Sequence, residues 1–342
     1  MTLGAKLHHT RAHRDCGGVA NKQTGLVSLP EYVRWSQHCA LGAIHRYHGG
    51  PGHQPWLYSN ETDGESGESI VRRFLNLRMK LMPMLLAAGE TATLEATPIV
   101  RRLDLVFPRA GANASRSDQY LFGDDILVAP FSGGWSDNGT ATRDVWLGPG
   151  SWQDSWSGDI RTGPQTVSST QPLGRVPMWH RQGGVVVTAP IAQTVEEQDW
   201  SVLGLELFPR PLLGKGHTRP HEAQTRRVVR EGEAGEGTTI TVQQTQQGQL
   251  AVEIAPSDAT PSRGWAVRVN LPPKHRLASA AANGLALSDG AVRTLQPLGE
   301  AESASHFPFT GGRPPSRAGP VAEVRLPQAA GRRSLLLQVE AL

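Results

Sequence analysis

Apolar residues in the first ninety positions recur at the three- and four-residue spacing of helices. The run 28–31 (SLPE) has the form of a capping box with proline at the first helical position, so we expect a helix of about three to four turns there. A second helix is expected from near Glu65 through Leu86, with Pro83 kinking it or ending its first half. Between them, residues 43–50 (AIHRYHGG) end in polar residues and glycines, as a strand leading into a loop does. This order is typical of an α/β unit.

From residue 97 the pattern changes to the two-residue alternation of strands. Residues 97–108 (TPIVRRLDLVFP) predict one strand, and residues 120–131 (YLFGDDILVAPF) predict a hairpin around a Gly-Asp-Asp turn. The polar stretches 215–237 and 298–320 predict exposed loops. Further strands are predicted at residues 144–147, 184–188, 239–242, 250–254, 265–271 and 335–339.

These patterns indicate more than one domain. A complete (β/α)8 barrel needs about 250 residues, and fewer than a hundred precede the β-rich part of this 342-residue chain. A barrel in this chain would therefore be incomplete. The later strands fit two modules that resemble β-sandwiches.

Charge and composition exclude some classes of partner. The chain has 34 Lys and Arg against 31 Asp and Glu, and its basic pairs are scattered, so we expect no nucleic-acid partner. No apolar run approaches the roughly 20 residues of a membrane helix, so we expect no membrane partner. The N-terminal residues lack the apolar core of a secretion signal, whereas three N-glycosylation sequons, at Asn60, Asn113 and Asn138, leave the compartment open.

Each candidate for chemistry also has an ordinary structural explanation. A cluster of His8, His9, His13, Asp15 and Cys16 lacks the ligand spacing of zinc sites, so we expect neither a metal nor another cofactor. Neither G-x-S-x-G nor the phosphate-binding G-x-x-x-x-G-K-[ST] occurs in the chain. Tryptophans of the β region could stack on sugar rings, although filling a core is the commoner use. They are Trp135, Trp146, Trp152, Trp156 and Trp179.

Several motifs in a fixed order narrow the field. They are DCGG at 15–18, EYVRWSQHCALGAIHRYHGG at 31–50, LRMKLMPMLL at 77–86, DQYLFGDDILVAPF at 118–131, GSWQDSWSG at 150–158 and VPMWHRQGGVVVTAP at 176–190. Together they resemble glycoside hydrolase family 31, whose members are mostly α-glucosidases and α-xylosidases. Beyond residue 190 only the order of domains supports the resemblance.

The resemblance implies a fold of the class α/β plus all-β. It predicts the C-terminal remnant of a (β/α)8 barrel over residues 1–92, followed by two β-sandwich-like domains over residues 93–195 and 196–342. It also implies a retaining reaction on an α-linked glycoside, which needs one carboxyl group as nucleophile and another as proton donor.

The resemblance further implies roles for three residues. Asp15 corresponds to the aspartate of the family's D-[IV]-G-G-F motif, and His48 corresponds to the histidine of an R-x-H motif that binds sugar hydroxyls in the cleavage subsite. Arg46 matches the arginine of that motif and is expected to support the site. The motifs that carry the family's nucleophile and acid do not occur before Asp15. We therefore expect substrate-binding residues but no catalytic residue in this chain, and an α-linked oligosaccharide as ligand.

The chain also departs from the family pattern. The basic stretch 6–14 (KLHHTRAHR) stands where the family has an apolar strand, and Cys16, Val19 and Met84 replace commoner residues. A shortened gene model explains this more easily than a short protein that reuses the tail of an enzyme. We favour the C-terminal part of an α-glycosidase, inactive alone. The alternative is a non-catalytic β-sandwich protein that binds carbohydrate or another partner.

Overall fold

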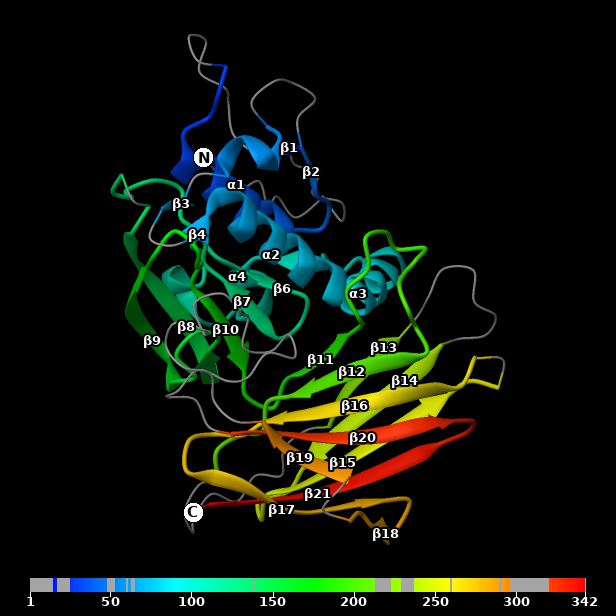
Figure 1. The fold of residues 1–342 in the computed structure, drawn as a ribbon. Helices are drawn as coiled ribbons and strands as arrows, with labels where there is room; N and C mark the ends of the chain where they lie inside the picture. The colour runs from blue at the N-terminus through cyan, green and yellow to red at the C-terminus, as the bar shows by residue number, and fades with distance from the viewer. Residues whose placement is uncertain are drawn as a thin grey trace. The chain divides into compact units, whose positions relative to one another are not determined.

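The computed structural model describes residues 15–16, 25–47, 53–59, 61–62, 65–137, 139–212, 223–228, 237–258, 260–288, 291–295 and 320–341. Most described elements are β-strands, and the few helices lie in the first third of the chain (Figure 1). Contacts within the chain divide it into two units, which are described separately. Unit 1 comprises Met1–Arg78, Ala88–Trp152 and Arg161–Trp179, and unit 2 comprises Met79–Ala87, Gln153–Ile160 and His180–Leu342.

Unit 1 begins with a strand, a helix and a second strand. β1 (Asp15–Cys16) and β2 (Arg46–Tyr47) pair in parallel, and α1 (Leu29–Ala40) lies between them in the chain. The 12 residues of α1 start where the sequence predicts and have the expected length. The capping-box prediction is wrong, because the Ser28 side chain makes no cap hydrogen bond. Pro30, at the second helical position, has no N–H to donate to it.

A break divides the long second helix into α2 (Gly67–Lys80) and α3 (Met82–Leu94). The break falls at Leu81, just before Pro83, as the sequence predicts, because a proline cannot continue the backbone hydrogen bonds of a helix. The helix begins at Gly67, between Glu65 and Glu68, where the sequence predicts its start. The short elements before it are η1 (Pro55–Tyr58), β3 (Glu61–Thr62) and β4 (Glu65–Ser66).

A six-stranded sheet follows, in the order β5-β6-β7-β10-β8-β9. The hairpin prediction is confirmed, since β6 and β7 are antiparallel and Gly123 in their turn has a φ of 64°. Glycine adopts this left-handed conformation without steric cost. The strands are β5 (Val100–Arg101), β6 (Tyr120–Phe122), β7 (Ile126–Val128), β8 (Ala141–Asp154), β9 (Ile160–Gln171) and β10 (Met178–Arg181).

The strand predicted over residues 97–108 is wrong beyond β5. The chain there forms the short helix α4 (Leu103–Val106). Leu103 and Phe107 pack on the same core cluster, whereas Leu105, on which the predicted alternation depended, is 43% exposed. Apolar residues four positions apart lie on one face of a helix, so core packing here favours a helical turn over a strand.

Tryptophans fill the interior of the β region. Trp146, Trp152 and Trp179 belong to one buried cluster in unit 1, and the indole N–H of Trp152 donates to a backbone carbonyl at 2.8 Å. Trp156, in unit 2, is also buried. The core interpretation is therefore confirmed for these four side chains, while Trp135 is half-buried.

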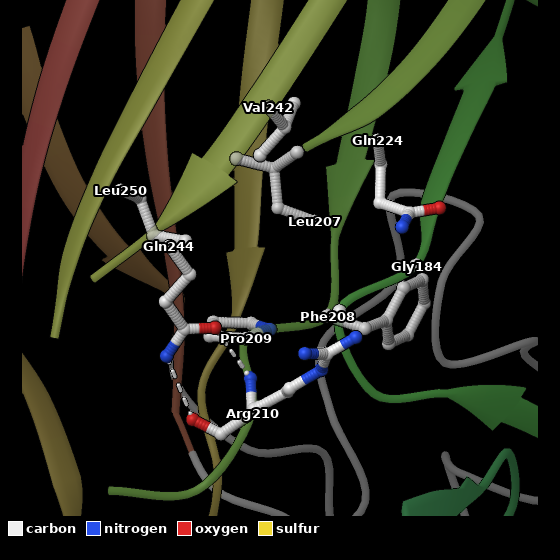
Figure 2. A pocket seen from close by; sticks show the side chains of 10 residues that line it. Gly184, Leu207, Phe208, Pro209, Arg210, Gln224, Val242, Gln244 and Leu250 are labelled. Carbon is white, nitrogen blue, oxygen red and sulfur yellow. Dashed lines mark hydrogen bonds between the residues drawn. The ribbon is translucent and has the colours of Figure 1, made fainter. Parts of the chain in front are cut away.

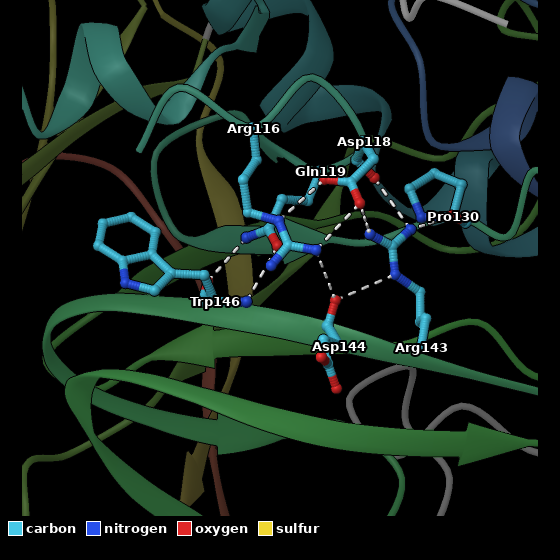
Figure 3. A network of polar contacts seen from close by, with 7 residues as sticks. All are labelled: Arg116, Asp118, Gln119, Pro130, Arg143, Asp144 and Trp146. Carbon is cyan, nitrogen blue, oxygen red and sulfur yellow. Dashed lines mark hydrogen bonds and ion pairs between the residues drawn. The ribbon is translucent and has the colours of Figure 1, made fainter. Parts of the chain in front are cut away.

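A polar network ties the first residues of the hairpin motif to β8 (Figure 3). Asp118 Oδ2 lies 3.1 Å from Arg116 Nη2 and 2.5 Å from Arg143 Nη2. Beside it, Gln119 exchanges two hydrogen bonds with the backbone of Trp146, at 2.7 and 2.9 Å. Burial acts to raise the pKa of Asp118, but the two arginines outweigh it and hold that pKa below its ordinary range.

Unit 2 contains two larger sheets. Five strands pair in the order β11-β12-β16-β20-β19, and six pair in the order β13-β14-β15-β21-β17-β18. Both sheets contribute to one buried cluster, with Leu205 and Val267 from the first and Ile240 and Leu337 from the second. The first sheet comprises β11 (Val185–Thr188), β12 (Val202–Leu207), β16 (Arg263–Asn270), β19 (Val292–Leu295) and β20 (Val321–Ala329). The second comprises β13 (Gln224–Val228), β14 (Thr238–Gln244), β15 (Gln249–Pro256), β17 (His275–Ala282), β18 (Leu285–Ala286) and β21 (Arg333–Ala341).

The loop predicted over residues 215–237 contains a strand, so that prediction is wrong over β13. This strand pairs antiparallel with β14, and its last residue, Val228, is buried in the cluster shared by both sheets. Pairing with a neighbour satisfies backbone groups that a polar local sequence does not predict. The other predicted loop, 298–320, lies outside the described residues except for its last position.

Candidate functional site

Two of the three candidate site residues are brought together by β1 and β2. Asp15 and Arg46 are register partners in this parallel pair, although α1 separates them in the chain. Arg46 is exposed, and Asp15 is described by its backbone position. His48 follows β2 and lies outside the described residues. Because the two strands are parallel and in this register, the backbones of Asp15 and Arg46 lie side by side at the same end of the pair.

Two constraints hold this pair to its helix. A disulfide joins Cys16 of β1 to Cys39 of α1, with Cα atoms 6.1 Å apart. Arg78 donates hydrogen bonds to the carbonyl oxygens of Gly42 at 2.6 Å and Ala43 at 2.8 Å, just beyond the C-terminal end of α1. Burial lowers the pKa of Arg78 to about 10. A cation there complements the negative end of the helix dipole and fixes the residues that lead into β2.

Arg34 anchors α1 to loops of the β region within unit 1. This buried side chain donates to the carbonyl oxygens of Gly139 at 2.6 Å, Pro172 at 3.0 Å and Arg175, and its guanidinium lies 4.4 Å from the centre of the Phe131 ring. All three acceptors are neutral, and burial lowers the pKa of Arg34. The side chain therefore positions the helix through hydrogen bonds to backbone rather than through an ion pair.

Aromatic rings gather beside β2. The ring centroid of Tyr32 lies 3.9 Å from that of Tyr58 and 5.7 Å from that of Tyr47, in stacked orientations. Burial raises the pKa of all three hydroxyl groups, so they stay neutral at physiological pH. Two positions before Tyr58, Trp56 is 67% exposed. An indole in this position can contact the apolar face of a sugar, and sequence reasoning missed it because it lies outside the quoted motifs.

His45 is a second residue that sequence reasoning did not single out. Its ring meets that of Tyr47 edge to face, with centroids 5.1 Å apart. Burial, together with the nearby Arg78, lowers the pKa of His45 to about 4. The imidazole is therefore neutral at pH 7, with both a donor and an acceptor nitrogen. Its position directly before Arg46 in the family motif is the sequence feature that could have identified it as a candidate.

A small hollow in unit 2 does not suit a sugar (Figure 2). Its volume is about 20 Å³, which holds about one water molecule. The side chain of Gln244 crosses it and exchanges hydrogen bonds of 2.8 and 2.9 Å with the backbone of Arg210. These two hydrogen bonds join residues that line the hollow, as Phe208 does, so we interpret the hollow as a small packing gap rather than a ligand site.

No group of three or more His, Cys, Asp and Glu side chains in the described residues could hold a metal ion. Of the N-terminal cluster, His8, His9 and His13 lie outside the described residues, and Cys16 forms the disulfide. Among the helices that the structure describes, none has the length and apolar character needed to cross a membrane.

Two family models match consecutive parts of the chain. Residues 14–88 match the glycosyl hydrolases family 31 TIM-barrel domain, and residues 96–186 match the glycosyl hydrolase family 31 C-terminal domain. The first match contains Asp15, Arg46 and His48. The resemblance noted from the motifs is therefore confirmed over these residues.

Two relatives show how much of a longer protein the chain resembles. It is 30% identical over 203 residues to a 1,6-α-glucosyltransferase of Sporosarcina globispora, covering 57% of this chain and 15% of that protein. It is 29% identical over 197 residues to an α-xylosidase of Emericella nidulans, covering 54% of this chain and 23% of that protein. The chain thus matches less than a quarter of the length of either relative.

A solved structure shares the fold over most of the chain. The Flavobacterium johnsoniae GH31 dextranase, in complex with isomaltotriose, aligns with a TM-score of 0.69 and 20% sequence identity. The alignment covers 91% of this chain and 37% of the dextranase.

Proposed function

We propose that this chain, whose residues 14–88 and 96–186 match two domains of glycosyl hydrolase family 31, is the C-terminal portion of a retaining α-glycosidase acting on α-linked oligosaccharides. The relatives named as an α-glucosyltransferase and an α-xylosidase support this class of substrate. Their names differ in sugar and in reaction, so the proposal stops at the class.

The proposed architecture has three parts. Residues 1–92 are the last strands and helices of a (β/α)8 barrel, residues 93–195 are a proximal β-sandwich and residues 196–342 are a distal one. The parallel pairing of β1 and β2 with α1 between them supports the barrel. The single core to which both sheets of unit 2 contribute supports the distal sandwich.

The proposed role of the first part is to form one wall of the sugar-binding pocket. The observation that carries it is the register of Asp15 with Arg46, which joins two separate family motifs at one end of a strand pair. We propose that Asp15 and His48 bind hydroxyl groups of the sugar and that Arg46 supports them. An ionised carboxylate accepts hydrogen bonds and a neutral imidazole both donates and accepts, which suits a ligand made of hydroxyls.

We propose that this chain does not supply the nucleophile or the proton donor of the reaction. A retaining reaction requires two carboxyl groups about 5 Å apart, one attacking the anomeric carbon and one protonating the leaving oxygen. The family motifs that carry both are absent from this sequence. We expect the chain alone to release p-nitrophenol from p-nitrophenyl α-glucoside or α-xyloside no faster than buffer. Hydrolysis by the chain that persists in Asp15→Asn would contradict the proposal that both catalytic carboxyl groups lie outside this chain.

A binding experiment tests the pocket wall itself. The chain is titrated with isomaltotriose and followed by NMR, and Asp15→Ala and His48→Ala are each expected to weaken binding about ten-fold, the value of a hydrogen bond to a polar ligand. Arg276→Ala is the matched surface control, because the Arg276 side chain is 62% exposed in unit 2. Equal affinity in all variants would remove Asp15 and His48 from the site.

The alternative of a carbohydrate-binding β-sandwich lacks its expected platform. Two of the tryptophans that motivated it, Trp152 and Trp156, are 0% and 4% exposed. A sugar cannot stack on either ring without opening the interior. Binding of starch that is lost in Trp156→Ala but kept in Trp56→Ala would favour this alternative over our proposal.

A further inference from the structure

Unit 2 contains a cavity for which the proposed function has no use. Its volume is about 580 Å³, within the range of small-molecule sites. Strands β11, β12, β16 and β20 of the five-stranded sheet and Lys80, the last residue of α2, line it. The apolar part of its wall includes Pro190, Val202, Leu203, Leu326 and Pro327.

The backbone of Lys80 is fixed at this wall. Its carbonyl oxygen accepts a hydrogen bond from Ala189 N at 2.9 Å. The preceding carbonyl, of Met79, accepts one from Gln198 Nε2 at 2.7 Å, and the same Nε2 donates to Pro190 O at 3.0 Å. These bonds hold the end of the helix against the chain that follows β11, so the half-buried Lys80 side chain is held at the cavity.

The carboxylates near the cavity already have partners. Arg268 donates to Glu206 Oε1 at 2.8 Å and to Glu323 Oε2 at 2.7 Å. The second oxygen of Glu206 accepts from Asn270 Nδ2 at 3.1 Å, and that of Glu323 accepts from Arg325 Nε at 2.9 Å. Both carboxylates are nearly fully buried. Their charges are therefore balanced within the sheet and are not available to Lys80 as close ion-pair partners.

Two cationic groups remain for a ligand. In the described structure, Lys80 has no ion pair. Arg325 uses its Nε for Glu323, and its side chain, which is 67% exposed, lines the cavity. Cationic donors with unused hydrogen-bonding capacity beside an apolar wall match a molecule with an anionic head and an apolar body.

We propose that this cavity binds a small organic carboxylate, whose anionic group lies on Lys80 and Arg325 and whose apolar body packs against Val202 and Pro327. A neutral oligosaccharide would give the Lys80 ammonium group no counter-charge. The site is therefore distinct in chemistry from the sugar-binding wall proposed above and does not depend on it.

The charges around Lys80 predict how binding depends on pH. Burial and, to a smaller extent, Arg268 on β16 lower the pKa of Lys80 to about 8, against the opposing effect of Glu206 on β12. Arg325 on β20 also lines the cavity. A bound carboxylate stabilises the ammonium form and raises this pKa, so binding at pH 8 takes up a proton. Affinity then falls as the pH rises above about 8, because free Lys80 becomes neutral.

The test uses the full chain and two probes of equal shape, naphthoate and its uncharged amide, naphthamide. Isothermal titration calorimetry at pH 7 is expected to give at least ten-fold tighter binding of naphthoate, because only the acid makes charge-assisted hydrogen bonds. Lys80→Met is expected to weaken naphthoate binding about ten-fold or more. Lys274→Met, an exposed lysine of unit 2 outside the cavity, keeps the wild-type affinity.

A measurement on the wild type keeps the test independent of the folding of any variant. At pH 8, trace acetic anhydride is expected to label Lys80 ahead of Lys274, and naphthoate is expected to protect Lys80 alone. Equal affinity for the acid and the amide, unchanged affinity in Lys80→Met, or labelling that naphthoate does not affect would each overturn the proposal.

Discussion

Two arginines in different parts of the molecule, Arg34, which is buried, and Arg268, which is 19% exposed, are stabilised in opposite ways. In unit 1, Arg34 donates only to neutral acceptors, mainly backbone carbonyl oxygens, and burial lowers its pKa. In unit 2, Arg268 lies between Glu206 and Glu323. Burial acts to lower the pKa of Arg268 as well, but the two carboxylates outweigh it and the net shift is upward.

The different hydrogen-bond partners of Arg34 and Arg268 indicate what each side chain contributes to the fold. Carbonyl oxygens carry no net charge, so Arg34 connects α1 to distant backbone segments and tolerates its own burial. Arg268 instead makes the burial of two carboxylates possible. Losing Arg34 would leave neutral carbonyl oxygens without their donor, whereas losing Arg268 would leave two buried carboxylates without their shared cation.

The largest effect is therefore expected for Arg268→Met. Two buried carboxylates lose their shared partner, and the local free energy of opening falls by about 4 kcal/mol. Hydrogen exchange of peptides from β12, β16 and β20, read by mass spectrometry, measures this. Arg332→Met is the control, because Arg332 is 74% exposed in its pair with Glu253. Its loss should change stability by less than about 0.5 kcal/mol.

The same variant should show a distinct pH dependence. In the wild type the arginines lower the pKa of Glu323 to about 2, so this group stabilises the folded state above its unfolded pKa and loses that effect as the pH falls. Arg268→Met keeps the part of this effect that Arg325 supplies and loses the part that Arg268 supplies. The difference between the two proteins is expected to shrink as the pH falls from about 5 to 2. A constant difference across this range would mean that Arg268 acts through packing alone.

A smaller effect is expected for Arg34→Met. Several carbonyl oxygens lose their donor, but methionine fills much of the space, so we expect a loss of about 2 to 3 kcal/mol. Hydrogen exchange of α1 and of the loop that contains Pro172 is the measurement. If Arg34→Met lowers the free energy of opening as much as Arg268→Met does, neutral and charged partners contribute equally to stability. That result would contradict the contrast drawn between the two arginines.

Asp118 provides an exposed counterpart in unit 1, a carboxylate between two arginines rather than an arginine between two carboxylates (Figure 3). Its side chain is 43% exposed, so solvent screens both pairs. Asp118→Asn is expected to cost less than about 1 kcal/mol in thermal or chemical unfolding. A loss as large as that of Arg268→Met would mean that burial does not set the value of these ion pairs.

The motif at residues 150–158 shows how much of the site and fold a sequence can predict. The sequence identifies the run and its family, but not what its aspartate does. In the structure Asp154 Oδ1 accepts hydrogen bonds from Trp156 N at 2.7 Å and Ser157 N at 2.8 Å. The residue thus stabilises the turn between β8 and β9, and a carboxylate in a motif is here a structural group.

The sequence by itself determined the features that depend on near neighbours. These include the start of α1, the break before Pro83 and the hairpin of β6 and β7, because backbone sterics and local spacing decide them within a few residues. The family motifs likewise identified Asp15, Arg46 and His48 as candidates for the site.

Only the tertiary structure decided which distant residues meet. It joined Cys16 to Cys39, placed Asp15 in register with Arg46, and brought Lys80 to a cavity beside Arg268. Such contacts depend on burial and on the loss of water around charges, which are properties of the folded surroundings rather than of any short stretch of sequence.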